Sequence, residues 1–353
     1  MPPMSDNEGM VLSRSWGLHG QERLVTDFRR AVVSAPRHAY VVTGPPQSGK
    51  RTLAVAFAKA MNCTRPPVPG EFCGECGICR RIDRGVFPDV TVFDLATQAD
   101  RERTSGKNLT LTIATVRDVS SQIAYRPSES RWKIIIVDDI ESMQETAQEA
   151  FLKTLEEPPA YAVILLLTAD ADLLLPTIRS RCVTVRMQVV NEEVIRGALA
   201  ERGVTGEDAA HIAALSDGRV GWAITAANDR ALLERGLADQ SDTIEWVKAS
   251  QYQRLLHAWM LAEEFSKDRE SVFRRLLAAQ RLWRALLYRR HGVVGVGTIV
   301  DIDLWPTGTA SLSGMTIVRA MTSLDECLTD LEANVRPRLA LQTMVMAWPE
   351  LSR

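Results

Sequence analysis

A glycine-rich loop between an apolar run and a helical segment constrains the fold of this chain more than any other feature of its sequence. The loop, from Gly44 to Lys50, reads Gly-Pro-Pro-Gln-Ser-Gly-Lys, and it lies between the apolar run Ala39–Thr43 and the helical-period segment Thr52–Met61. A Walker A motif requires this strand–loop–helix context. In such a motif backbone N–H groups and a helix N-terminus face phosphate oxygens, and the lysine reaches the outer phosphates. The alternative is a glycine-rich turn without a ligand.

Apolar runs rich in β-branched residues predict the buried strands of a parallel sheet. Segments of helical period separate these runs, and the alternation predicts a three-layer α/β domain over residues 1–187. The expected strands are Ala39–Thr43, Val90–Leu95, Lys133–Val137, Val163–Thr168 and the short Val183–Met187, and the expected helices include Thr52–Met61, Ile113–Ala124 and Thr146–Leu155.

The chain after residue 187 is expected to be helical. Short segments broken by Gly203, Gly206 and Gly218 predict a small helical lid over residues 188–237, and longer amphipathic segments predict a helical domain over residues 238–353. A glycine-rich loop is expected within that domain, from Gly292 to Gly314.

The composition excludes several classes of protein. A net charge of −2 lacks the basic excess of proteins that bind nucleic acid strongly by themselves, so contacts with DNA are expected to be local or shared with partners. The N-terminal residues have neither the basic start nor the apolar core of a signal peptide. The longest apolar stretch, Tyr161–Ala169, is far shorter than the ~20 residues that cross a bilayer. A cytoplasmic protein with no membrane role is expected.

The residue after the loop lysine departs from the Walker A pattern. A Ser or Thr hydroxyl at that position binds Mg²⁺ beside the β- and γ-phosphates, but this chain has Arg51. Thr52 does not replace it, because one helical step turns a side chain by ~100°. The guanidinium is expected to repel the metal or to replace part of its charge by binding phosphate. Binding of ATP or ADP is therefore expected to survive better than hydrolysis.

A second acidic motif shows a related change. The run Lys133–Val137 is followed by Asp138 and Asp139, which is the Walker B pattern. Asp138 fits the metal-binding carboxylate, but active ATPases usually have Glu at the next place, and the shorter Asp139 would sit back from the attacking water by more than the tolerance of ~0.5 Å. The alternative is a pair of solvent-facing carboxylates at a strand end. The residues expected at the nucleotide are Gly44, Pro45, Pro46, Gln47, Ser48, Gly49, Lys50, Arg51, Thr52, Asp138 and Asp139.

Cys63, Cys73, Cys76 and Cys79 crowd into one short segment. Four thiolates close a tetrahedral shell around Zn²⁺ and leave no open position for catalysis, so a structural zinc site is expected. An iron–sulfur cluster, disulfides and cysteines without metal are the alternatives, and taken alone the pattern also fits a nucleic-acid-binding ribbon.

Further motifs resemble the clamp-loader branch of the AAA+ ATPases. Phe151–Pro159 (FLKTLEEPP) and Leu173–Cys182 (LLLPTIRSRC) carry the resemblance, and the cysteine insertion followed by Phe87-Pro-Asp89 resembles the bacterial members. The similarity continues to Asn334–Leu341, which resembles the closing helix of the family's collar domain. It implies that residues 238–353 form a collar and that the chain is a component of the DNA polymerase III holoenzyme, acting with a sliding clamp and primed DNA.

Three departures from the motor pattern favour one type within this family. The resemblance leaves a choice between the hydrolysing gamma/tau motor and the delta-prime subunit, a partner of gamma/tau and delta without turnover of its own. A motor should have Ser or Thr in place of Arg51, Glu in place of Asp139, and arginine in place of Gly221, with Arg219 as a nearby substitute. The departures favour delta-prime. An active gamma/tau-like ATPase and a free-standing zinc module that binds nucleic acid are the alternatives.

The Ser180-Arg181-Cys182 signature of the family is intact. The resemblance implies that Arg181 is an arginine finger acting in trans, which stabilises the γ-phosphate in the ATP site of a neighbouring subunit. The alternative is an arginine in a surface ion pair at the end of a helix.

Overall fold

The computed structural model describes residues 16–102, 110–293, 312–333 and 335–350. The chain forms two compact units, Met1–Val190 with Arg219–Gly221, and Asn191–Gly218 with Trp222–Arg353. The expected divisions at residues 187 and 237 stay predictions. The expected loop at 292–314 lies mostly outside the described residues.

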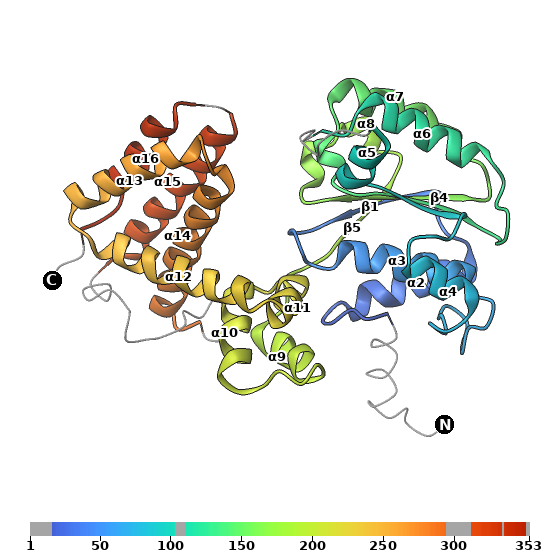
Figure 1. Cartoon of the computed structure of the whole chain (residues 1–353), viewed down its shortest axis with the longest axis horizontal. Helices are drawn as coiled ribbons and strands as arrows, with labels where there is room; N and C mark the ends of the chain where they lie inside the picture. The colour runs from blue at the N-terminus through green and yellow to red at the C-terminus, as the bar shows by residue number, and fades with distance from the viewer. Residues whose placement is uncertain (1–15, 103–109, 294–311, 334, 351–353) are drawn as a thin grey trace. The chain divides into compact units, whose positions relative to one another are not determined.

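A parallel sheet forms the centre of the first unit (Figure 1). The strands run in the order β2-β3-β4-β1-β5. All residues of β3 and β4 are buried, which explains why their sequences are continuous apolar runs and not alternating ones. The strands are β1 (Ala39–Thr43), β2 (Val90–Phe93), β3 (Lys133–Val137), β4 (Ala162–Thr168) and β5 (Val183–Arg186). The predicted parallel α/β fold is confirmed.

The expected strand Val90–Leu95 was too long. The strand ends at Phe93, and Leu95 begins a helix. Asp94 separates the two elements: its Oδ1 accepts the N–H of Thr97 at 2.7 Å, and its own N–H donates to the Thr97 hydroxyl at 2.9 Å. These reciprocal bonds cap the helix start, and for this reason the strand does not continue to Leu95.

Helices cover both faces of the sheet (Figure 1). Tyr40 of β1 packs against the aromatic rings of Phe28 and Phe57, and Val42 belongs to the same core. Val41 belongs to the core on the opposite face. One face carries α2 (Glu22–Ser34), α3 (Lys50–Asn62) and α4 (Gly77–Asp83), and the other carries α5 (Leu95–Glu102), α6 (Ile113–Ala124), α7 (Glu145–Glu156) and α8 (Pro176–Arg179), with the short turns η1 (Ile140–Ser142) and η2 (Ala171–Leu173) at strand ends.

The second unit is helical. A core that includes Trp246, Trp283 and Trp348 lies among its last five helices. The helices are α9 (Glu192–Ala200), α10 (Gly206–Ser216), α11 (Val220–Asn228, of which the first two residues belong to the first unit), α12 (Arg230–Lys248), α13 (Gln251–Phe265), α14 (Arg269–Arg290), α15 (Gly314–Glu332) and α16 (Pro337–Met346). Among the described residues, none of the helices has both the length and the apolar character that a membrane crossing needs.

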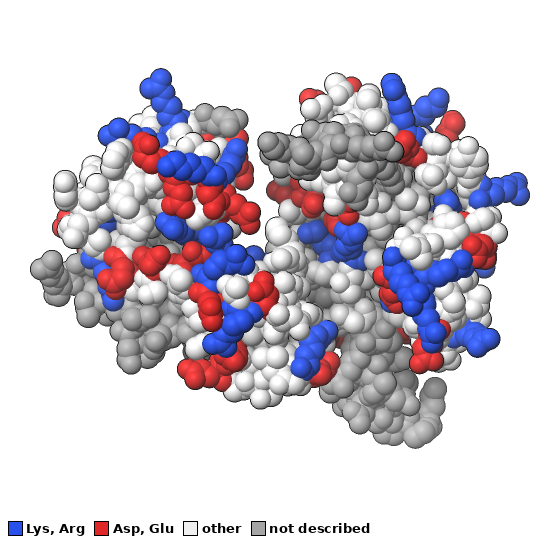
Figure 2. Space-filling model, viewed as in Figure 1, with Lys and Arg blue, Asp and Glu red and all other residues white. Residues whose placement is uncertain are grey.

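Basic and acidic side chains occur together on both units. On the face drawn in Figure 2, Lys and Arg lie beside Asp and Glu. This mixture agrees with the net charge of −2. Local or shared contact with DNA stays a prediction.

Candidate functional site

The glycine-rich loop joins β1 to α3 at the carboxyl end of the sheet. The N–H of Gly44 donates to the carbonyl of Thr168 on β4 at 3.2 Å, and a Cβ at Gly44 would lie 2.7 Å from the carbonyl oxygen of Met187. Gly49, the residue before α3, has a φ of +102°. Glycine is therefore required at both positions, because a side chain would clash at the first and strain the backbone at the second.

Lys50 begins α3, and it points back toward the loop. Its ammonium group is buried and donates to the carbonyls of Gly44 at 2.7 Å and Pro45 at 3.1 Å. Burial lowers the pKa of Lys50, and the nearby carboxylates of Glu141, Asp138 and Asp139 oppose this shift. The ammonium group of Lys50 therefore interacts with the loop carbonyls and with these three carboxylates.

Ser48 adds an unused donor to the loop. The residue is 5% exposed, and its hydroxyl has no hydrogen-bond partner among the described residues. At the start of α3 the first backbone N–H groups also lack acceptors inside the helix. The loop thus offers several donors to an anion.

Arg51 occupies the place of the missing hydroxyl, on the first turn of α3. Its Nη1 lies 2.7 Å from Oδ2 of Asp94 and 3.5 Å from Oδ2 of Asp138. The guanidinium thereby connects the ends of β2 and β3. Asp94 was missed by the sequence analysis, because it is 43 residues from Arg51 and only the pairing of β2 with β3 brings it to this edge.

Asp138 and Asp139 follow β3, as expected. Burial, then the charge of Asp139, raises the pKa of Asp138, and Arg51 acts in the opposite direction. Burial and Glu141 raise the pKa of Asp139, which has a φ of +52°. Glu141, which the sequence analysis also missed, accepts the N–H of Ala169 at 2.7 Å and so connects η1 with the end of β4. Ionisation of these crowded acids depends on the cations beside them.

The four clustered cysteines converge. Their sulfur atoms all lie within 4.8 Å of one another, and Sγ of Cys63 is 3.6 Å from Sγ of Cys73. A tetrahedral zinc site with Zn–S bonds of ≈ 2.3 Å places its sulfurs about 3.8 Å apart. Although burial acts in the opposite direction, hydrogen bonds from Cys79 and Thr64 lower the pKa of Cys76 to about 6. The four residues fit a closed metal site.

Arg181 lies between α8 and β5. It donates to the carbonyl of Thr177 at 2.9 Å and to the Glu156 carboxylate at 2.5 Å, and about a third of its side chain is exposed. The ion pair of the alternative interpretation is therefore present. Among the described residues, none of its hydrogen bonds joins Arg181 to the phosphate loop of the same chain. Cys182 is half-buried, and burial raises its pKa to about 12.

Comparisons with known proteins find similarity to subunits of DNA polymerase III. Residues 20–191 match the family model described as DNA polymerase III, delta subunit. Over this part the chain is similar to clamp-loader subunits of DNA polymerase III. The match covers the whole sheet, the glycine-rich loop and the cysteine cluster of the first unit.

Subunits of more than one type within the clamp-loader family resemble this chain. The gamma subunit of Buchnera aphidicola from Acyrthosiphon pisum is 31% identical over 192 residues, which is 52% of this chain and 50% of that protein. The delta' subunit of Pseudomonas aeruginosa is 35% identical over 146 residues, 41% of this chain and 42% of that protein. The chain thus spans about half the length of the curated relatives it matches, or less.

A solved structure is also similar to this chain. It is a DNA polymerase III gamma subunit-related protein from Thermotoga maritima, with 22% identity, a TM-score of 0.45, and coverage of 91% of this chain and 97% of that one.

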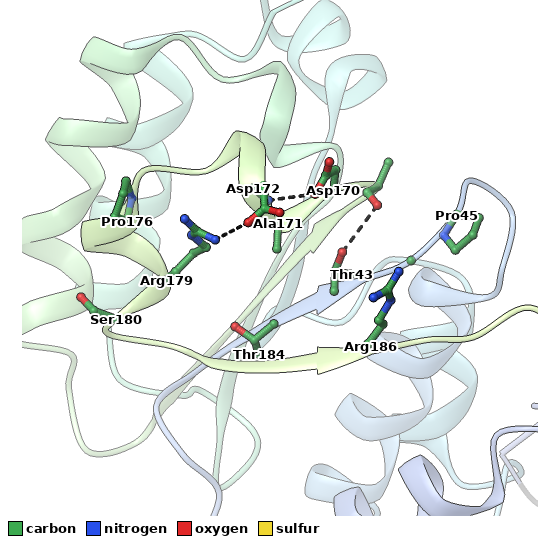
Figure 3. Close-up of a pocket in the computed structure, with 12 residues that line it drawn as sticks. Thr43, Pro45, Asp170, Ala171, Asp172, Pro176, Arg179, Ser180, Thr184 and Arg186 are labelled. Carbon is green, nitrogen blue, oxygen red and sulfur yellow. Dashed lines mark hydrogen bonds and ion pairs between the residues drawn. The ribbon is translucent and has the colours of Figure 1, made fainter. Parts of the chain in front are cut away.

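A cavity of about 870 Å³ lies beside Ser180, in the segment between β4 and β5 (Figure 3). An ion pair joins Arg179 to Asp172 on its wall, and Arg186 and Thr184 face it from β5. The lining residues are Thr43, Gly44, Pro45, Ala169, Asp170, Ala171, Asp172, Pro176, Arg179, Ser180, Thr184 and Arg186. The cavity was not predicted from the sequence, because its walls come from β1, β5, the glycine-rich loop and the segment between β4 and β5.

Proposed function

We propose that this chain is a delta-prime-type subunit of the DNA polymerase III clamp loader, which assembles with gamma/tau and delta subunits and helps to place the sliding clamp on primed DNA in the cytoplasm. One observation carries the proposal. Arg51 holds Asp94 and Asp138 where a motor needs a hydroxyl and a free metal-binding carboxylate. The site therefore lacks the groups for hydrolysis, and the subunit acts through its neighbours.

In this proposal the subunit acts on a neighbouring ATPase subunit through Arg181. Its guanidinium is partly exposed and is held by Glu156 at the surface, so that it can exchange this carboxylate for the γ-phosphate of a neighbour's ATP. Exposed ion pairs stabilise by only ~0.2–1 kcal/mol, so breaking the pair with Glu156 costs little free energy. An arginine finger of this kind contributes about 10³–10⁵ in rate.

The cysteine cluster holds a structural Zn²⁺ in this proposal. Cys63 directly follows α3, and Cys79 lies on α4, so a metal ion would connect the helix of the phosphate loop with the inserted module. The ion would supply cross-linking and no reaction chemistry, since four thiolates leave no open position.

Substitution of the finger tests this function. We expect clamp-loader assemblies that contain Arg181→Ala to form normally. The ATPase activity stimulated by DNA and clamp should fall by about 10²-fold or more, because the neighbour's transition state loses a stabilising positive charge. The measurement is steady-state phosphate release by the reconstituted assembly. Arg196→Ala, at an exposed arginine of α9, is the control and should stay near wild type. Unchanged stimulated turnover with Arg181→Ala would refute the trans role.

An active gamma/tau-type ATPase is the second candidate, since a gamma subunit matches half of this chain. The two candidates differ in turnover by the isolated chain. We expect no ATP hydrolysis above background with Mg²⁺ present, and hence no effect of Lys50→Ala on phosphate release. Robust Mg²⁺-dependent turnover that disappears in Lys50→Ala would instead support the motor.

A further inference from the structure

We propose that Arg51 permanently replaces the divalent cation of the phosphate loop, so that the loop binds the polyphosphate of a nucleoside di- or triphosphate without a metal ion. The inference rests on the proposed assignment of the Gly44 to Lys50 loop to nucleotides. It concerns the chain's own loop, and it is independent of the role proposed for Arg181.

The carboxylates that would bind a metal already have N–H partners. Oδ1 of Asp94 accepts the N–H of Thr97 at 2.7 Å, and its Oδ2 accepts Arg51. Oδ1 of Asp138 accepts the N–H of Asp139 at 3.1 Å, and its Oδ2 lies 3.5 Å from Arg51. Mg²⁺ demands near-octahedral oxygen ligands at about 2.0–2.1 Å. The residues present do not fit this ion, because it would have to displace a guanidinium and then remain beside it.

The acids around the loop create a need for a cation. Asp94, Asp138, Asp139 and Glu141 lie at this edge of the sheet, and the charges of the last three act on Lys50. A polyphosphate placed here with only Lys50 beside it would meet strong repulsion. Where a P-loop site binds Mg²⁺, the ion offsets this charge. Arg51 does so here by its contacts with Asp94 and Asp138.

The remaining donors of the loop suit an anion. The Arg51 side chain is 52% exposed, and only its Nη1 group contacts the two carboxylates within the described residues. A guanidinium has five N–H donors in a fixed fork, so the others remain for phosphate oxygens. The buried Ser48 hydroxyl, which has no partner in the described part of the chain, and the buried ammonium group of Lys50 lie in the same loop.

Nucleotide binding with and without metal tests the inference. ADP is titrated into the full chain by calorimetry, once in EDTA and once with excess Mg²⁺. We expect the two dissociation constants of the wild type to agree within about twofold, which is a free-energy difference of ~0.4 kcal/mol. Arg51→Thr restores the hydroxyl and removes the guanidinium. Its affinity in EDTA should fall about tenfold or more, or ~1.4 kcal/mol, and Mg²⁺ should restore it.

A matched control removes the same charge elsewhere. Arg117→Thr replaces an exposed arginine on α6 and should bind ADP like the wild type in both buffers. Three results would overturn the inference: wild-type binding strengthened about tenfold or more by Mg²⁺, no wild-type binding of ADP in EDTA at millimolar concentration, or equal affinities of Arg51→Thr and the wild type in EDTA. The wild-type comparison needs no variant, so it stands even if Arg51→Thr does not fold.

The two proposals fail in different ways. Metal-independent ADP binding without any effect of Arg181→Ala in the assembly would support this inference and refute the proposed trans role. Loss of stimulated turnover in Arg181→Ala, together with a chain that binds no ADP, would support the proposed trans role and refute this inference.

Discussion

At the scale of single residues, buried charges in this chain are held by several partners at once. Asp89, from the Phe87-Pro-Asp89 motif, is fully buried, and its carboxylate accepts the N–H groups of Ser128, Glu129 and Ser130 at 2.8 to 3.0 Å. The Lys133 ammonium lies 3.9 Å away. The motif therefore anchors the loop before β3, and Asp89 has a structural role.

Asp89→Asn should destabilise the chain by about 2–4 kcal/mol, because an amide N–H₂ would face backbone donors and the charge partner of Lys133 would be lost. Urea unfolding followed by circular dichroism measures the change. Asp27→Asn, at an exposed residue paired with Arg30, is the control and should stay within about 0.5 kcal/mol of the wild type.

The comparison of the wild type with Asp89→Asn also gives a pH test. Burial acts to raise the pKa of Asp89, but the hydrogen bonds from Ser128 and Glu129 outweigh it and lower the pKa below its usual value. A depressed pKa stabilises the fold at pH values above the unfolded-state pKa of about 3.9, and the contribution is lost as the pH falls through the folded-state value. The stability difference between the wild type and Asp89→Asn should therefore shrink only below about pH 4. A difference that shrank already between neutral pH and pH 5 would contradict this account.

At the scale of elements, α4 is too short to be stable alone. It has seven residues, and isolated helices shorter than ~12–15 residues are marginal in water. Its N-cap residue is Cys76, whose sulfur accepts the N–H of Cys79, so the cysteine cluster and the helix form together.

Metal removal should therefore unfold α4 locally. We expect about one zinc ion per chain by elemental analysis, and faster hydrogen exchange over Gly77–Asp83 after chelation. A fall in stability of about 2.7 kcal/mol would correspond to removing a ligand present at a hundred times its dissociation constant. Cys76→Ser should lose the metal, whereas Cys182→Ser, outside the cluster, should keep it. A chain purified without metal that a chelator leaves unchanged would contradict the zinc proposal.

At the scale of the whole molecule, the order of the strands decides which distant residues meet. The pairing of β2 with β3 places Asp94 beside Asp138, and α3 brings Arg51 to both of them. In the same way the end of α7 supplies Glu156 to Arg181, 25 residues later in the chain. Asp94 belongs to no motif named in the sequence, and the FLKTLEEPP motif that contains Glu156 does not indicate that this residue pairs with Arg181.

The local sequence was enough to predict the strands, the glycine-rich loop and the cysteine cluster, because each depends on residues that are close in sequence. The strands follow from apolar runs, the loop from glycines beside a lysine, and the cluster from thiols at short spacing. The boundary error at Leu95 arose where a side-chain cap overrides propensity. Only the tertiary structure decided the partners of Arg51 and Arg181 and the cavity between the strand ends. Ion pairs act over a few ångströms in space, and the sheet determines which charges come within that distance.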